Sequence, residues 1–330
     1  KYKEKTKYTL DKIAEIKKEW DKDKEKTRKA YPDLFYYYDG LVGCEVSQGM
    51  HPAGIIVTCV NVCDVCGQFW GKNKQKEDVL ISPLDMDSVH DLWIPKFDFL
   101  GLSTVGIIDK TCKLIEKKFP KTYEVDWEDQ NVFNDISKDS TGIFQFESDF
   151  AKQSIQKMQP KSVEDICLTS ACIRPSGESY REEVFEHKYH KNPSPLIDNI
   201  LGNSYGRLVY QEQTIAFLQQ VCGFSGSEAD NVRRGIGMKK KELIDAAMPK
   251  ILDGYCKNSD KPREVAEQEA KEFLQVIEDS SSYSFGYNHA MGYAMLSYIE
   301  GYLRYYHTTE FCTSYLNCAK TDEDISRGTN

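Results

Sequence analysis

The sequence has 330 residues, 40% hydrophobic and 29% charged, a composition typical of a folded globular protein with one large domain or roughly two to three small ones. The formal net charge of −9 argues against a uniformly basic nucleic-acid-binding surface, although it is compatible with a local basic cleft. No apolar run is long enough to span a membrane and no signal peptide is visible, so we expect a cytoplasmic protein without a membrane partner.

Two further features of the composition bear on where the protein is found and how it is made. The 11 cysteines are expected to be mostly reduced thiols, as is usual in the cytosol. The first residue is lysine rather than methionine, and we therefore expect an excised segment or a processed product.

The N-terminal 30 residues are densely charged with both signs. Apolar residues at helical spacing, among them Ile13 and Trp20, predict one long and mostly exposed helix. The stretch "YPDLFYYYDG" is predicted to break this helix at Pro32 and Gly40.

From residue 50 to 103 the sequence has short β-rich runs. Strands are predicted in "GIIVTCVNV", "VLISPLDM" and "WIPKFDFLGL", and "GKNKQKED" is predicted to be a hairpin tip. From about residue 104 the pattern is mainly helical, with helices expected in "TVGIIDKTCKLIEKKF", "FAKQSIQKMQ", "SVEDICLTSACI", "EQTIAFLQQVCGF", "SEADNVRRGIG", "KELIDAAMPKILDGYC", "REVAEQEAKEFLQVIED" and the aromatic-rich segment 289–318. The predicted fold class is α+β and mostly helical: a helical piece, a small sheet and a large helical region.

Asp98 is a lone carboxylate between Phe97 and Phe99 in an otherwise apolar run. On a strand, Lys96 and Asp98 would point to one face and the two phenylalanines to a packed core on the other. Burying a charge is costly unless it is paired, and a metal ion is one such partner. A lysine beside an aspartate suits a phosphate-plus-metal site, and the alternative is an ion pair on an exposed sheet face.

Two other clusters contain residues that bind metals in many proteins. Asp85 and Asp87 would aim their carboxylates the same way if "PLDMDS" were a strand, although the same residues also suit a turn. Cys59, Cys63 and Cys66 lack the second paired cluster that zinc sites have, so buried or half-buried free thiols are the preferred interpretation.

The stretch "NVRRGIGMKKKE" is the densest basic cluster outside the N-terminus. Ser227 with Asp230 could cap a helix that carries Arg233 and Arg234, two glycines would end it, and residues 239–241 would open the next helix. Cations and free backbone N–H groups at such a helix junction could bind a triphosphate, and a solvated basic loop is the alternative.

Three more stretches combine aromatic and hydrogen-bonding side chains. They are "ACIRPSGESYRE" with Arg174, "RLVYQEQ" with Arg207, Tyr210 and Gln211, and "SFGYNHAMGY" with His289. Such mixtures are typical of contacts to nucleotides and bases, and each stretch could equally be an ordinary helix start.

Taken in order, "HPAGIIV", "KFDFLGLSTVGIID", "GIFQFES", "RPSGE", "YGRLVYQEQ", "ADNVRRGIGMKKKE" and "SFGYNHAMGYAMLSY" resemble the catalytic subunit of bacterial C-family replicative DNA polymerases, the DNA polymerase III alpha subunit. The resemblance runs from about residue 40 to 318. It implies a nucleotidyltransferase-like palm in which three carboxylates hold two Mg²⁺ ions for transfer of a dNTP to a primer 3′-hydroxyl.

The resemblance also implies roles for particular residues. Asp98 takes the place of the family's third catalytic carboxylate and is the implied metal ligand, and Lys96 matches a lysine near the incoming nucleotide. The implied nucleotide-binding residues are Arg233, Arg234, Lys239, Lys240, Arg174, Tyr210, Gln211 and His289, and the implied DNA-binding residues are Lys241, Arg207 and His51.

By this resemblance residues 1–45 correspond to the end of a helical thumb, 46–105 to the second part of the palm, and 106–330 to helical fingers. The family's D-x-D pair of catalytic aspartates, upstream of the thumb, has no counterpart before residue 40, and Tyr287 stands where many members have lysine. We therefore expect a DNA-directed DNA polymerase segment that is inactive alone. Its expected partners are dNTP, primer–template DNA and, through regions outside this sequence, other replisome subunits.

Two other hypotheses compete with this one. A non-catalytic nucleic-acid-binding or interaction protein could have kept the fingers and lost the active site. An unrelated enzyme could use Asp85, Asp87 and Asp98 as its own metal cluster, in which case substitution of Asp85 or Asp87 would abolish metal binding.

Overall fold

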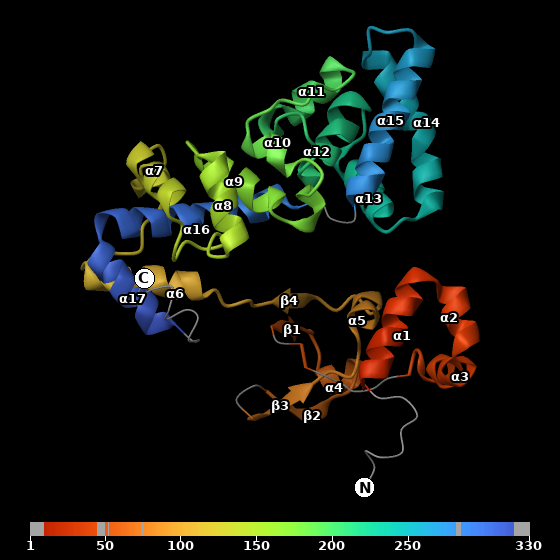
Figure 1. The fold of residues 1–330 in the computed structure, drawn as a ribbon, viewed down its shortest axis with the longest axis horizontal. Coiled ribbons are helices and arrows are strands. Elements are labelled where there is room, and N and C mark those ends of the chain that lie inside the picture. The colour runs from red at the N-terminus through yellow and green to blue at the C-terminus, as the bar shows by residue number, and fades with distance from the viewer. Residues whose placement is uncertain (1–9, 45–49, 52, 74–75, 282–284, 320–330) are drawn as a thin grey trace. The chain divides into compact units, whose positions relative to one another are not determined.

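The computed structural model describes residues 10–44, 50–51, 53–73, 76–281 and 285–319. The chain divides into two compact units, residues 1–101 and residues 102–330, and each is described by itself. Figure 1 labels the helices and strands of both units. The assignment of thumb, palm and fingers to the ranges given above stays a prediction.

The first unit begins with three short helices instead of the single long one predicted. They are α1 (Leu10–Lys22), α2 (Lys24–Ala30) and α3 (Pro32–Leu41). The chain is extended at Asp23, whose side chain caps α2 by accepting the N–H of Lys26. Pro32 starts α3 instead of only ending a helix, because proline is well tolerated at a first helical position, and Gly40 lies inside α3.

An aromatic contact and an ion pair are among the interactions that hold the three helices together. The ring of Trp20 stacks on that of Phe35 at 4.8 Å, and Phe35 is buried. Arg28 forms a bidentate ion pair with Asp39: Nη1 donates to Oδ2 at 2.5 Å and Nη2 donates to Oδ1 at 2.9 Å. The Arg28 guanidinium also lies over the Phe35 ring.

The β-rich part of the first unit forms two small antiparallel sheets. Strand β1 (Gly54–Ile56) pairs with β4 (Lys96–Asp98). Strand β2 (Phe69–Lys72) pairs with β3 (Asp78–Ile81) and forms the predicted hairpin. Residues 74–75 at the tip of this hairpin lie outside the described part of the chain. The strands are shorter than predicted, and two of the apolar runs end at the first residue of a short helix, α4 (Val62–Val65) or α5 (Met86–Asp91).

The second unit is helical. Its elements are α6 (Ser103–Leu114), η1 (Thr122–Glu124), α7 (Gln130–Lys138), α8 (Asp149–Met158), α9 (Val163–Cys172), η2 (Pro175–Gly177), α10 (Arg181–Phe185), α11 (Pro195–Leu201), η3 (Gly202–Ser204), α12 (Gln211–Ala216), the π-helical turn η4 (Phe217–Val221), α13 (Gly226–Gly237), α14 (Lys241–Asn258), α15 (Arg263–Ser281), α16 (Tyr287–Tyr306) and α17 (Thr308–Cys318). The segment 289–318 is thus two helices, which His307 separates because its backbone is not helical.

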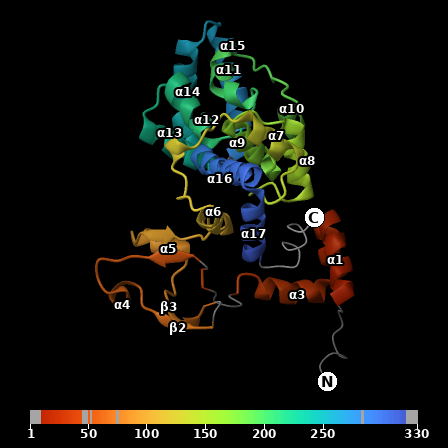
Figure 2. The same cartoon turned by 90° about the vertical axis from the view of Figure 1, so that its left-hand side faces the viewer.

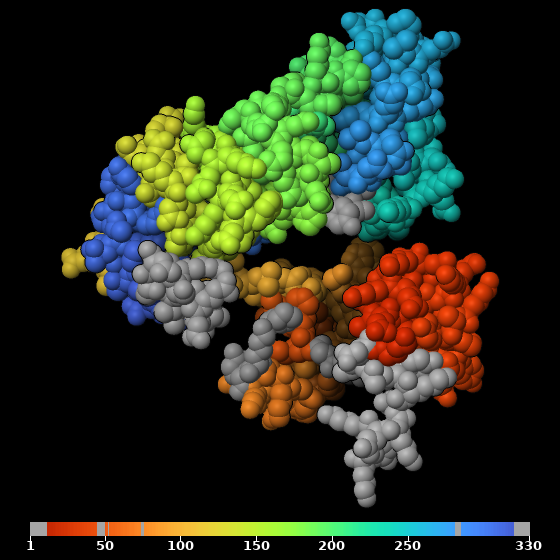
Figure 3. Space-filling view, viewed as in Figure 1, coloured from red at the N-terminus to blue at the C-terminus, as the bar shows by residue number. Residues whose placement is uncertain are grey.

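Helix α16 is the central element of this unit. It packs against α7 and α9 in one hydrophobic core and against α6 and α17 in another, and Figures 1 and 2 show α6 and α17 side by side. A further core is formed by residues of α11, η4, α13, α14 and α15, and Figure 3 shows the atoms of α14 and α15 in contact with one another. The predicted mostly helical α+β fold class is confirmed. Among the described residues, no helix combines the length and apolar character needed to cross a bilayer.

Candidate active site

The pairing of β1 with β4 brings three of the predicted site residues, His51, Lys96 and Asp98, together around Gly54. Gly54 lies directly opposite Asp98, and Lys96 Nζ lies 2.8 Å from Asp98 Oδ1 and 2.9 Å from Oδ2. His51 Nδ1 accepts the Gly54 N–H at 2.7 Å and lies 3.7 Å from Asp98 Oδ1. The imidazole proton is therefore carried by Nε2, which is left available to donate.

Gly54 is required for this arrangement. A Cβ added there would lie 2.7 Å from Lys96 Cε, 2.9 Å from His51 Nδ1 and 3.2 Å from Asp98 Oδ1. The absence of a side chain at Gly54 allows the side chains of His51, Lys96 and Asp98 to converge over the backbone.

Asp98 is not buried, contrary to the reasoning from its apolar neighbours. Its side chain is 44% exposed, and Phe97 and Phe99 are 50% and 68% exposed, so the predicted packed core on the opposite face is wrong. The hydrogen bond and charge of Lys96 lower the pKa of the Asp98 carboxyl. The pair as it stands is an ion pair on an exposed sheet face.

His51, Gly54 and Lys96 open onto a pocket of about 500 Å³. Its walls also include Ile81 and Val89, from β3 and α5. A pocket of this size is in the range of small-ligand sites, so the cluster has room to receive a ligand.

Asp85 and Asp87 are not paired on a strand. Asp85 is the N-cap of α5, where its carboxylate accepts the Ser88 N–H at 2.8 Å, and Asp87 lies within that helix. The described residues contain no group of three His, Cys, Asp or Glu side chains that could hold a metal ion.

The described residues fit only part of the implied Mg²⁺ site. Mg²⁺ prefers oxygen ligands and commonly takes one or two carboxylates together with substrate phosphates, so Asp98 can supply one ligand. A two-ion site does not fit this single carboxylate. The cysteine cluster is no substitute, because Mg²⁺ prefers oxygen ligands to thiols. Cys59 and Cys63 are exposed, and not buried or half-buried as expected, while Cys66 is half-buried.

In the second unit, Arg174 lies at one end of a series of side-chain contacts that continues through the rings of Phe285, His289 and Tyr293. Gln145 Oε1 accepts from Arg174 Nη2 at 3.2 Å, and the guanidinium lies over the Phe285 ring at 5.0 Å. The Phe285 ring contacts His289 at 5.3 Å, and His289 contacts Tyr293 at 4.2 Å between centroids. Within the described part of the chain Arg174 has no carboxylate partner, and its buried Nε has no acceptor.

A second link joins the "YQEQ" stretch to Phe285. Tyr210 and Phe285 form a β-bridge, and the Gln211 N–H donates to the Phe285 carbonyl at 3.0 Å. Gln211 Oε1 in turn accepts from Arg233 Nη1 at 3.1 Å. Tyr210 is only 6% exposed, and its hydroxyl forms a hydrogen bond with Cys167 Sγ at 3.6 Å. Burial raises the pKa of this hydroxyl, so Tyr210 contributes to the core here.

Asp230 holds both arginines of the basic stretch. It lies 2.9 Å from Arg233 Nη2 and 2.9 Å from Arg234 Nε, and the hydrogen bonds and charges of these arginines, mainly Arg233, lower its pKa. Arg234 is the more exposed of the two, at 62% against 24%. The predicted Ser227–Asp230 cap is wrong, because a capping box of Ser225 and Glu228 starts α13 two residues earlier than that pattern suggested.

The lysines of this stretch lie where α13 ends and α14 begins, as predicted. Lys239 has a left-handed backbone, with φ of 54°, and Lys239, Lys240 and Lys241 are all exposed. Arg207, in contrast, is committed to an ion pair with Glu183.

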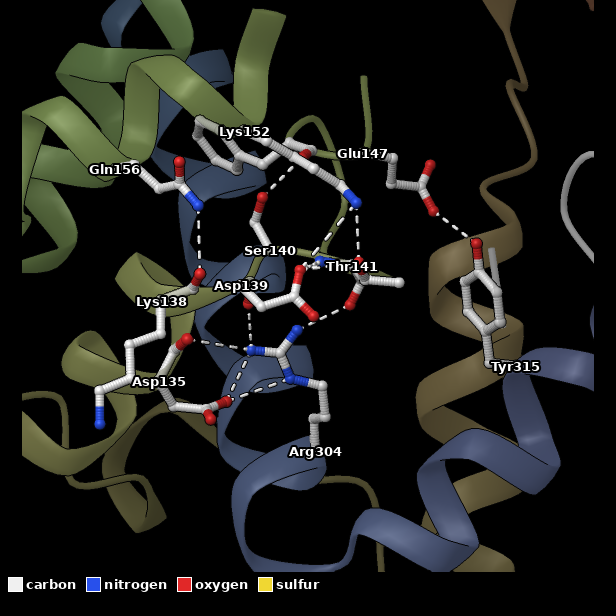
Figure 4. A network of polar contacts seen from close by, with 11 residues as sticks. Asp135, Lys138, Asp139, Ser140, Thr141, Glu147, Lys152, Gln156, Arg304 and Tyr315 are labelled. Atoms are coloured by element: carbon white, nitrogen blue, oxygen red, sulfur yellow. Dashed lines mark hydrogen bonds and ion pairs between the residues drawn. The ribbon is translucent and has the colours of Figure 1, made fainter. Parts of the chain in front are cut away.

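The loop 139–147 positions Gln145, a residue for which no role was predicted from the sequence. Arg304 of α16 donates to the carbonyls of Thr141 at 2.7 Å and Asp139 at 2.5 Å and pairs with Asp135 of α7 at 2.6 Å (Figure 4). With only 12% of its side chain exposed, Arg304 satisfies loop carbonyls that would otherwise lack donors.

Figure 4 shows two more contacts that fix the same loop. Lys152 donates to Thr141 Oγ1 at 2.8 Å, and Tyr315 donates to Glu147 Oε1 at 2.8 Å. Gln145 itself has a left-handed backbone, with φ of 71°, which such anchoring can maintain. The sequence feature that could have pointed to Gln145 was its position in the motif "GIFQFES".

Two family models match the chain, one in each unit. Residues 1–101 match the bacterial DNA polymerase III alpha NTPase domain, and residues 104–259 match the bacterial DNA polymerase III alpha subunit finger domain. The chain is 28% identical to DNA polymerase III subunit alpha of Ureaplasma parvum over 96% of its own length, and 29% identical to that of Campylobacter jejuni over 88% and that of Bacillus subtilis over 83%.

The chain spans about a third of the Ureaplasma relative's length (34%) and about a quarter of the other two (25% and 24%). All three relatives are named DNA polymerase III subunit alpha, and the predicted resemblance is confirmed. The chain belongs to the bacterial DNA polymerase III alpha family and carries a portion of that subunit, its NTPase and finger domains.

Proposed function

We propose that this chain is the palm–fingers portion of a template-directed DNA polymerase that acts in DNA replication in the cytoplasm. The observation that carries the proposal is the row of Arg174, Phe285 and His289, joined through Gln211 to Arg233, in one part of the helical unit. The substrates are a dNTP and primer–template DNA, and other replisome subunits are reached through the rest of the polymerase.

The fingers residues bind the nucleotide in this proposal. Arg234 and Lys240 are exposed cations near the α13–α14 junction and suit the triphosphate, since charge-assisted hydrogen bonds to phosphate are among the strongest available. Arg174, which lacks a carboxylate partner among the described residues, supplies a further cation. The exposed His289 ring offers a face on which a base can stack.

In the reaction, the primer 3′-oxygen forms a bond to the α-phosphorus, the bond from that phosphorus to the bridging oxygen breaks, and pyrophosphate leaves. Bound Mg²⁺ would stabilise the charge on the phosphates and the entering oxygen. Asp98 would supply one of its ligands, and Lys96 would hold that carboxylate in place and neutralise charge beside the substrate. With a single suitable carboxylate in the described residues, we expect the chain alone to be inactive.

That single carboxylate also favours a second candidate, a nucleic-acid-binding protein without catalysis. The two candidates differ in dNTP binding, because a protein that only binds DNA has no need of a triphosphate site. The shared test is therefore nucleotide affinity.

The test is calorimetric titration of the 330-residue chain with dATP and Mg²⁺, comparing wild type with Arg234→Ala. Loss of a charge-assisted contact worth about 1.5–3 kcal/mol predicts affinity lower by roughly ten- to a hundredfold. The control is Arg263→Ala, since Arg263 is equally exposed (65%) and also paired to carboxylates on helices of the same unit. Equal affinity of wild type and both variants, or no binding by wild type, would contradict the nucleotide site.

A further inference from the structure

A pocket of about 480 Å³ lies at the opposite end of α16 from His289. Its walls are apolar and aromatic, formed by Ile115, Phe119, Ile299, Tyr302 and Leu303. The rise of an α-helix puts Leu303 about 21 Å from His289 along the axis, so this pocket is separate from the proposed nucleotide site.

The rim of the pocket is positively charged. Lys117, Lys118, Lys121 and His307 line it, with Glu124 as the acidic member. All three lysines are exposed, and within the described residues Lys117 and Lys118 form no ion pair, while Lys121 lies 4.0 Å from Glu124. In a chain of net charge −9, three lysines in five residues form a distinct local patch.

Aromatic side chains alternate with these lysines in "KKFPKTY". Phe119 is 39% exposed and Tyr123 is 76% exposed, and the Lys121 ammonium lies 5.4 Å from the centre of the Tyr123 ring. A preference of cations for a helix C-terminus would explain Lys117 and Lys118 at the end of α6, but it does not explain the exposed rings beside them.

The backbone of this segment is held at both ends. Glu116 adopts a left-handed conformation, with φ of 57°, and the Lys117 N–H donates to the Cys112 carbonyl at 2.9 Å, which closes the end of α6. Downstream, Trp127 Nε1 donates to the Thr122 carbonyl at 2.6 Å. The lysines and rings therefore project from a fixed stretch of chain, so little order is lost when a ligand binds.

We propose that the pocket and the segment 117–123 form a binding site for single-stranded DNA, separate from the dNTP site. Lys117, Lys118 and Lys121 contact phosphates, and unpaired bases stack on Phe119 and Tyr123 or enter the pocket beside Tyr302. Alternating cations and aromatic rings are the features by which proteins hold single strands without reading their sequence. The inference rests on the proposed function only for the choice of DNA among anionic polymers.

The experiment measures fluorescence anisotropy of a labelled oligothymidylate of about 12 nucleotides, a length within usual single-strand site sizes. We expect Lys117→Gln/Lys118→Gln to weaken binding and to reduce the slope of log affinity against log salt by about 1.4, at about 0.7 per phosphate contact. Phe119→Ala is expected to weaken binding about fivefold or more without changing that slope.

The matched control is Lys257→Gln/Lys271→Gln, which removes the same charge from exposed positions on α14 and α15. Equal losses in both double variants, or no effect of Phe119→Ala, would overturn the proposal in favour of general charge attraction. Inorganic polyphosphate that displaces the labelled oligonucleotide as well as unlabelled oligonucleotide does would also overturn the proposal in favour of general charge attraction.

A peptide of aspartates ending in phenylalanine tests the other ligand that the pocket could take. If it binds in a way that depends on Lys117 and Lys118 while the oligonucleotide does not bind, the site is for an acidic protein segment and the proposal is wrong. Titration of Lys117→Gln/Lys118→Gln with dATP separates the two proposals, because its affinity for dATP should match wild type. Oligonucleotide binding that persists in a chain unable to bind dATP would refute the nucleotide site alone.

Discussion

Glu300, in α16, gives the most direct test of the physical reasoning. It is 1% exposed, and its Oε2 accepts the Phe144 N–H at 2.7 Å. Burial raises the pKa of Glu300 from 4.5 to about 8, and the hydrogen bond from Phe144 only partly opposes this. The folded protein therefore holds a proton on Glu300 at neutral pH that the unfolded chain releases.

The sign of the pH dependence follows from this difference. Between pH 4.5 and about 8 the folded state binds more protons at Glu300 than the unfolded state, so its contribution to stability falls as the pH rises through that window. A shift from 4.5 to about 8, at about 1.36 kcal/mol per pH unit, corresponds to a loss of roughly 4 to 5 kcal/mol. Below pH 4.5 the full contribution is present, and above pH 8 it is gone.

Glu300→Gln mimics the protonated acid, because the amide oxygen can still accept the Phe144 N–H. We expect wild type and variant to have similar unfolding free energies at pH 5, and the variant to be several kcal/mol more stable at pH 9. Urea unfolding, followed by circular dichroism at a series of pH values, measures the difference in unfolding free energy between the two proteins. The contributions of the other titrating groups are common to both proteins and cancel in this difference. The exposed Glu264→Gln is the control. A Glu300→Gln difference that does not grow between pH 5 and pH 9 would refute a buried, protonated Glu300.

Three more predictions follow from contacts described above. Gly54→Ala should destabilise the first unit by about 1–3 kcal/mol, seen as a lower urea midpoint, because its Cβ would collide with Lys96, His51 and Asp98; an unchanged midpoint would mean that the three side chains move apart freely. Ser225→Ala should cost about 1 kcal/mol by removing the α13 cap, measured in the same way, whereas Ser225→Thr, which keeps the hydroxyl that accepts the Glu228 N–H and donates to the Glu228 carboxylate, should retain most of the stability. Arg304→Met should cost about 3–5 kcal/mol, because it leaves Asp135 and the loop carbonyls unpaired, and thermal unfolding should show this; a change below about 1 kcal/mol would contradict a structural role for the ion pair.

The helices of the second unit could be predicted from hydrophobic periodicity because it is a local signal that most of them carry strongly. Where a second local signal was overlooked, the prediction was wrong, as at Asp23, whose capping side chain divides the first helix, and at Ser225, whose capping box starts α13. The strands were predicted too long because apolar character extends past the residues that pair with a neighbouring strand, and Asn61 and Asp85 cap short helices at the ends of two of these runs.

The arrangement of the site was less accessible to sequence reasoning. Gln145 meets Arg174 across 29 residues and Arg304 meets Asp135 across 169, and no local pattern records contacts of such separation. The prediction that Asp98 is buried was wrong for a related reason. The apolar character of Phe97 and Phe99 predicts that something should cover them, but burial depends on which part of the fold lies against that face.

The two-stranded sheet of β1 and β4 has a consequence for handling the protein in solution. Within the described residues neither strand has a second neighbour, so each leaves one row of backbone donors and acceptors unmatched, and Ile55 and Phe97, which pair across the sheet, are each about half exposed (53% and 50%). Bare strand edges beside apolar side chains recruit strands from other molecules. Self-association that rises with concentration, and protease cleavage that begins in this unit, are therefore to be expected of the isolated chain, and an added strand that pairs with β1 or β4 should suppress both.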